Sequence, residues 1–123
     1  MTFEEKVILL RHTYDAFNRR DVDAVLSALD PEIEWPNVLE RSVIHGRQAV
    51  LQYWRRQFQR IHSRVTPTDF SQHGELVIVN VHQVVRDLET NQVREQLVAH
   101  AYTFRGDLVL RMEVYSTADD ARR

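Results

Sequence analysis

His100 is the residue of this sequence best suited to move a proton, and its neighbours predict where its side chain lies. It belongs to a run of β-branched and aromatic residues, 93–104. In a strand, alternate residues share one face, so the imidazole would lie beside Val98, Tyr102 and Phe104. Burial among apolar side chains lowers the pKa of an imidazole, whereas a nearby carboxylate raises it. We expect His100 to line a pocket and, if the protein is an enzyme, to shuttle the proton.

Glu113 is the carboxylate that could support His100, provided that the last hairpin has a suitable register. A two-residue turn at Arg105-Gly106 places Arg111 and Glu113 on the face of His100, with Glu113 as a diagonal neighbour at roughly 7–8 Å. That pair could share a proton, as general acid–base catalysis requires, and Arg111 could bind a substrate carboxylate or enolate. A three-residue turn instead places three apolar residues there: Leu108, Leu110 and Met112. The sequence leaves both registers open.

Two further polar side chains are candidates to hold a substrate oxygen. Tyr14 lies on the apolar stripe of the first expected helix, where its phenol could donate a hydrogen bond to a ligand. Gln83 interrupts a valine-rich run, which indicates either a ligand contact or a hydrogen bond to the helix layer. For both residues the alternative is a purely structural role, since a core tyrosine often has a buried ring and a solvent-exposed hydroxyl.

Other kinds of chemistry are disfavoured by residues that the sequence lacks. It has no cysteine, and therefore no disulfide, thiolate nucleophile or thiolate metal site. Its three glycines, Gly46, Gly74 and Gly106, form no phosphate-binding loop. No pair of histidines has the spacing of a helical metal site with an acid nearby. We expect neither a metal nor a cofactor.

Length and charge limit the class of protein. The chain has 123 residues, is 43% hydrophobic and carries a net charge of -2. We expect one domain over residues 1–123, with a polar tail, 117–123, that frays. The charge lacks the basic excess of a nucleic-acid-binding protein, and no apolar run approaches the ~18 residues of a membrane span. With no signal peptide at its start, the sequence predicts a cytoplasmic protein that binds neither nucleic acid nor membrane.

Helical periodicity dominates residues 1–62. An amphipathic stripe with three- and four-residue spacing predicts the first helix: Phe3, Val7, Leu10, Tyr14 and Phe17. Asp21 is a good N-cap for a short second helix that Asp30-Pro31 ends, and a third helix begins at Arg47. Between them we expect a short extended stretch around Ile33 and Trp35 and a loop over residues 40–45.

Strand periodicity replaces it after residue 62. The runs 76–87, 93–104 and 108–115 are separated by turn sequences, and 62–70 is a further strand broken by Pro67. Pairing Leu88 with Val93 would place Val81 opposite His100. Helices followed by an antiparallel meander indicate an α+β fold.

Several segments together resemble one family. They are Tyr14–Val25, Ile33–Trp35, His45–Val50 and His100–Glu113. In order and spacing they look like SnoaL-like domains of the nuclear transport factor two-like superfamily, and the resemblance covers roughly residues 4–116.

The resemblance implies a cone, in which a curved antiparallel sheet and three N-terminal helices enclose a deep, mostly apolar pocket, commonly in a homodimer. Under this fold Trp35, Trp54 and Phe58 would form the pocket wall beside Val98 and Tyr102. Asn37 matches the position of the aspartate base of steroid isomerases, but an amide cannot take a proton.

The resemblance also implies a range of functions, because its members include steroid isomerases, epoxide hydrolases, scytalone dehydratase, polyketide cyclases and non-catalytic carriers. We therefore expect a protein that binds a small apolar or ring-containing organic molecule. If it is an enzyme, the reaction would be a cofactor-free isomerisation, dehydration or cyclisation. The alternative is a non-catalytic ligand carrier or dimerisation module.

Overall fold

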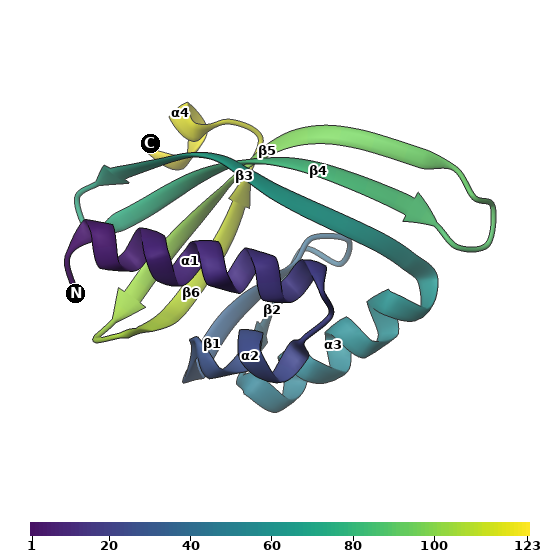
Figure 1. The fold of residues 1–123 in the computed structure, drawn as a ribbon, viewed down its shortest axis with the longest axis horizontal. Helices are drawn as coiled ribbons and strands as arrows, with labels where there is room; N and C mark the ends of the chain where they lie inside the picture. Colours follow the sequence, from purple (N-terminus) through teal and green to yellow (C-terminus); the bar gives the residue numbers. More distant parts are fainter.

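Six strands form one curved, open sheet in the computed structural model, which describes residues 1–123 (Figure 1). In chain order they are β1 (Leu29–Asn37), β2 (Ser42–His45), β3 (Ile61–His73), β4 (Leu76–Asp87), β5 (Val93–Arg105) and β6 (Leu108–Tyr115). Their order in the sheet is β2-β1-β6-β5-β4-β3. This confirms the expected α+β cone, with one correction: β1 runs parallel to β6, so the sheet is mixed rather than wholly antiparallel.

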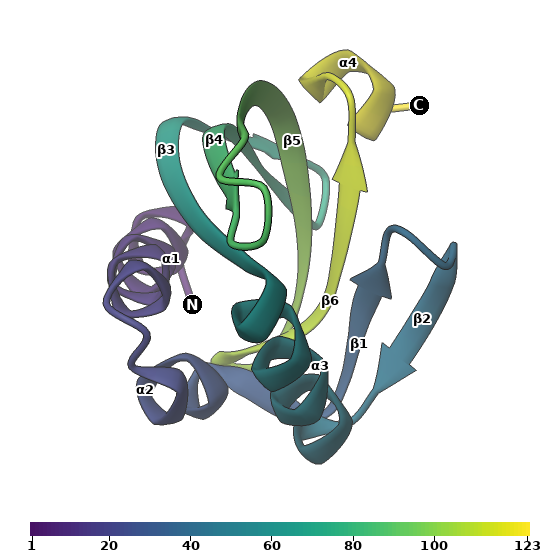
Figure 2. The ribbon, with the colours of Figure 1, turned by 90° about the vertical axis from the view of Figure 1, so that its right-hand side faces the viewer.

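Three helices line the inner side of the curved sheet: α1 (Phe3–Asn18), α2 (Val22–Ser27) and α3 (Arg47–Arg60) (Figures 1 and 2). Thr2 and Glu5 cap α1 reciprocally, and the Asp21 carboxylate accepts from the backbone N–H of Ala24 at the start of α2, as expected of an N-cap. None of these helices is long and apolar enough to cross a membrane.

Two segments that were expected to lack regular structure have it. Residues 42–45, expected in a loop, form β2, because residues 34–37 of β1 offer a free edge with which they pair. The tail, expected to fray, forms α4 (Ala118–Ala121), which Thr117 caps. Ala121 is buried against Ile78, Ala99 and Ala101, and this small apolar contact holds the tail on the sheet.

The β4–β5 hairpin has the expected faces but a different register. Val79 pairs with His100 and Arg86 with Val93, a shift of two residues from the predicted pairing of Leu88 with Val93. The Asp87 carboxylate accepts backbone N–H groups of the turn, which ends the strand before Leu88. Since side chains alternate with period two, a two-residue shift leaves the inner face unchanged.

The last hairpin decides against Glu113 and Arg111 as partners of His100. Val114 pairs with His100, Met112 with Tyr102 and Glu113 with Ala101. A bulge between Val109 and Arg111 turns Val109, rather than Leu108 and Leu110, into the core. This register buries three apolar side chains of β6 and leaves its charged ones on the other face.

Asn18, at the end of α1, fastens the helix to the edge strand β3. Its amide nitrogen donates to the carbonyl of Val65 at 2.8 Å, and its carbonyl oxygen accepts from the Val65 N–H at 2.9 Å. The side chain thus satisfies both backbone groups of one residue, as a neighbouring strand would. This contact sets how α1, with Tyr14 and Phe17, lies against the sheet.

Asn18→Asp should lower the free energy of unfolding by about 1–3 kcal/mol, because a carboxylate cannot donate to the Val65 carbonyl. Urea unfolding at pH 7 measures the loss. Gln92→Glu makes the same chemical change at an exposed side chain and should be close to neutral. Equal stabilities of the two variants would show that the Asn18 contact contributes nothing.

Candidate functional site

Three buried polar side chains meet between α1 and β5. The Tyr14 hydroxyl lies 2.7 Å from Nδ1 of His100 and 2.7 Å from the hydroxyl of Tyr102. The Tyr14 and His100 rings stack with centroids 5.9 Å apart, and Tyr102 meets both edge-on. His100 and Tyr102 are neighbours on the inner face of β5, as the alternation of residues predicted.

The directions of these hydrogen bonds follow from counting donors. Tyr102 donates to the Tyr14 oxygen, so the hydroxyl hydrogen of Tyr14 is free to donate to Nδ1 of His100. A neutral imidazole that accepts at Nδ1 carries its proton on Nε2. The two tyrosines therefore select the Nε2–H tautomer.

Burial determines the protonation states of Tyr14, His100 and Tyr102. It lowers the pKa of His100 to about 4 and raises the pKa values of Tyr14 and Tyr102. Burial is the one effect that shifts the pKa of His100, because no carboxylate faces the imidazole to raise it. At neutral pH the three side chains are uncharged, and Nε2–H is a neutral hydrogen-bond donor.

The imidazole of His100 borders an open cavity. Its Nε2 atom makes no hydrogen bond within the chain, and since no fully buried side-chain nitrogen or oxygen lacks a partner, Nε2 keeps some exposed surface. His100 borders a cavity of about 290 Å³ between the sheet, α3 and the β1–β2 hairpin. In Figure 2, α3 lies between β3 and the β1–β2 hairpin. The walls are mostly apolar; among them are Trp35, Trp54, Phe58, Val98 and Met112.

The cavity also has a polar side, away from His100. The Gln96 amide donates to Oε1 of Gln83 at 3.0 Å, and the Gln83 amide donates to Oγ of Ser63 at 3.2 Å. Arg94 lines the same side. The arrangement can therefore hold an apolar ring in its middle and oxygen atoms at both ends.

Most of the predicted pocket residues line this cavity, but the expected acidic partner does not. Trp35, Trp54, Phe58, Gln83 and Val98 line it together with His100. Tyr14 and Tyr102 lie behind His100 and border a smaller adjoining cavity of about 60 Å³.

Three predicted residues lie elsewhere. Glu113 accepts from the Tyr115 hydroxyl at 3.0 Å on the other face of the sheet. Arg111 donates to Glu34 on β1, and Asn37 donates to Glu40 at the hairpin tip. Each is engaged locally, so the expected His100–Glu113 pair does not form.

Ser63, Arg94 and Tyr53 line the cavity but were not predicted from the sequence as cavity residues. The alternation of side chains along the strand could have identified Arg94, since it shares the even-numbered face with His100. Ser63 and Tyr53 carried no such signal, because β3 and α3 meet the cavity only through tertiary packing.

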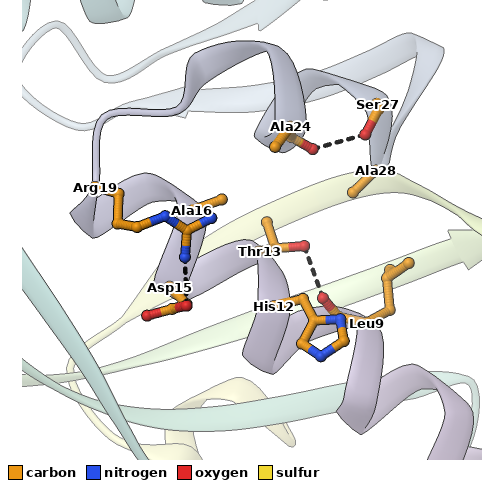
Figure 3. A pocket seen from close by; sticks show the side chains of 9 residues that line it. All are labelled: Leu9, His12, Thr13, Asp15, Ala16, Arg19, Ala24, Ser27 and Ala28. Carbon is orange, nitrogen blue, oxygen red and sulfur yellow. Dashed lines mark hydrogen bonds and ion pairs between the residues drawn. The ribbon is translucent and has the colours of Figure 1, made fainter.

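A larger groove of about 510 Å³ lies on the outside of the molecule, between α1 and α2 (Figure 3). Most of its polar side chains are engaged locally: Thr13 donates to the Leu9 carbonyl, Ser27 to the Ala24 carbonyl, and Arg19 pairs with Asp15. His12 also lines the groove, and it is exposed. The structure also holds no cluster of three or more His, Asp or Glu side chains that could bind a metal.

A curved sheet wrapped around helices, with an apolar cavity on its inner face, defines the nuclear transport factor two-like fold. A family model for the SnoaL-like domain matches residues 10–112, and the chain belongs to this family. The resemblance predicted from the sequence is thereby confirmed. No curated protein matches the sequence.

Solved structures share the fold at low sequence identity. A protein of unknown function from Burkholderia pseudomallei has a TM-score of 0.83 and 23% identity, over 98% of this chain and 95% of that one. TerC, crystallised with polyporic acid, has a TM-score of 0.81 and 20% identity, over 95% of both chains. An epoxide hydrolase from M. tuberculosis has a TM-score of 0.78 and 18% identity, over 95% of this chain and 86% of that one.

Tyr14→Phe should lower the free energy of unfolding by about 1–3 kcal/mol, because Nδ1 of His100 and the Tyr102 hydroxyl both lose their buried partner. The control is Tyr115→Phe, which removes a hydroxyl bonded to Glu113 at the surface and should cost less. Chemical unfolding at neutral pH compares the two. Losses of equal size would contradict a special role for the buried network.

Acidification should destabilise the protein through His100. Its pKa is about 4 when folded and about 6.5 when unfolded, so the unfolded state binds more protons between these values. Stability therefore falls as pH drops through this window, by about 2 kcal/mol between pH 7 and pH 5. His100→Gln should remove this part of the pH dependence, and urea unfolding of both proteins at the two pH values measures it. An unchanged slope in the variant would contradict the assignment.

Proposed function

We propose that this protein binds a small, ring-containing organic molecule in the 290 Å³ cavity and polarises one of its oxygen atoms with Nε2–H of His100. The observation that carries the proposal is the hydrogen bond of Tyr14 to Nδ1, which leaves Nε2 as a fixed donor facing the cavity. The volume is near the lower end of the range for ligand pockets, and the largely apolar wall suits a ring system.

The reaction class that this geometry supports is cofactor-free isomerisation, dehydration or cyclisation. A neutral donor beside a carbonyl oxygen stabilises the negative charge that develops when a neighbouring carbon loses a proton. Because the cavity lining has no carboxylate, that proton would pass to water or to a basic group of the ligand itself. The donor role is favoured over full proton transfer. If Nε2 gave up its proton and Tyr14 refilled Nδ1, the charge would pass to a tyrosine whose pKa burial has raised.

A base role for Nε2 is possible only after the network reverses. Nδ1–H would then donate to Tyr14 and Tyr14 to Tyr102, and the Tyr102 hydrogen would be left without a partner. A buried hydroxyl hydrogen without a partner costs about 1–3 kcal/mol. The tautomer with the proton on Nε2 of His100 therefore dominates.

A second candidate function is ligand carriage without chemistry. It is supported by the absence of a carboxylate among the cavity residues, since none of them can serve as a strong general base. Activity on a true substrate separates the two candidates. In an enzyme, His100→Gln should lower kcat by about 10²–10³, as removal of an oxyanion-stabilising donor does.

Filling the cavity should weaken ligand binding. Val98→Trp adds an indole to the inner face, and it should weaken binding of the fluorescent apolar probe N-phenylnaphthylamine at least tenfold. The neighbouring Leu97 is 72% exposed on the outer face, so Leu97→Trp is the matched control and should bind the probe as the wild type does. Circular dichroism checks that both variants fold. Undiminished binding by a folded Val98→Trp variant would show that the cavity is not the binding site.

A further inference from the structure

The cavity has an unbalanced charge. Among the residues that line it, Arg94 is the one with a full charge at neutral pH, and none is acidic. The only other titratable groups in the lining are His100, which is neutral, and the phenol of Tyr53. The lining therefore offers a ligand one positive side chain and no negative one, while the carboxylates of Asp87 and Glu40 act on Arg94 and Tyr53 from outside the lining.

Arg94 is free to bind a ligand. It pairs with Val85 across the hairpin, which places it on the inner face with Gln96 and His100. No carboxylate lies within ion-pair distance of its guanidinium. The Asp87 carboxylate accepts the backbone N–H groups of Thr90 and Glu89, which lower its pKa, and the Arg94 guanidinium lowers that pKa further without forming an ion pair. Glu40 is bound by Asn37 outside the cavity lining.

The side chains beside Arg94 are held in place by one another. Gln96 donates to Gln83 and Gln83 donates to Ser63, so the Ser63 hydroxyl hydrogen and the second amide hydrogen of Gln96 remain available. Donors for an oxygen-rich group thus stand next to the guanidinium, and Nε2–H of His100 stands at the other end.

We propose that the natural ligand is an organic anion: an apolar ring system with a carboxylate or another acidic oxygen group at Arg94 and a second oxygen at Nε2 of His100. Arginine binds such groups through paired hydrogen bonds in its planar fork. Arg94 and His100 are six residue steps apart, which span at most about 22 Å of strand, and the length of the Arg94 side chain shortens the gap. A fused or linked pair of rings fits this span.

This inference rests on the proposed function, and two matched probes test it separately. Anilinonaphthalene sulfonate and N-phenylnaphthylamine share one ring skeleton, and only the first carries an anionic group. Only binding that Val98→Trp removes counts as cavity binding. We expect the sulfonate to bind the cavity more tightly than the neutral probe, with an advantage that falls as salt concentration rises.

Arg94→Gln should weaken sulfonate binding about three- to tenfold and leave the neutral probe unaffected, the modest size reflecting the exposure of Arg94 to water. Arg86→Gln is the control, because it removes the same charge from the outer face of the same hairpin, and it should change neither affinity.

Equal effects of Arg94→Gln on both probes, or none on either, would overturn the inference and leave the proposed function standing. Sulfonate binding that survives Val98→Trp would also overturn it, because the anion would then bind outside the cavity. If neither probe binds the cavity of the wild type, the proposed function itself fails.

Discussion

The hydrogen-bonded chain from Tyr102 through Tyr14 to His100 is the constraint on which the site depends. Three polar side chains buried between a helix and a sheet are tolerable only because each satisfies another. These hydrogen bonds therefore require α1 to lie at one height and angle on β5, and the contact of Asn18 with Val65 holds the helix there. The packing of α1 on the sheet and the tautomer of His100 thus rest on the same contacts.

The same hydrogen-bond network of Tyr102, Tyr14 and His100 determines which polar groups the cavity can offer. A histidine in water is half protonated near pH 6.5 and exchanges tautomers freely, whereas His100 is neutral and presents one hydrogen to the cavity. Since Glu113 lies on the other face of the sheet, nothing restores its basicity. The cavity is consequently rich in donors, with Arg94 at one end, and suits a ligand that brings its own negative charge or acidic oxygens.

The fold alone says little about the reaction. Solved structures that share the fold include a protein of unknown function and an epoxide hydrolase, and these two are 23% and 18% identical to this chain. In such a superfamily the scaffold is shared, and side chains in the cavity decide the activity. The Tyr14–His100–Tyr102 network and Arg94 are therefore more informative about this protein than its architecture.

The sequence by itself determined the helices α1, α2 and α3, the longer strands and the faces of the strands, though not β2 or α4, because the spacing of apolar residues reports which side chains are buried regardless of their partners. His100, Val98 and Gln83 were placed on the inner face for this reason, even though the predicted register was two residues off. Only the tertiary structure decided the rest. The bulge in β6 that turns Glu113 away, and the meeting of Tyr14 with His100, depend on contacts between segments up to 86 residues apart. Local periodicity carries no information about such distances.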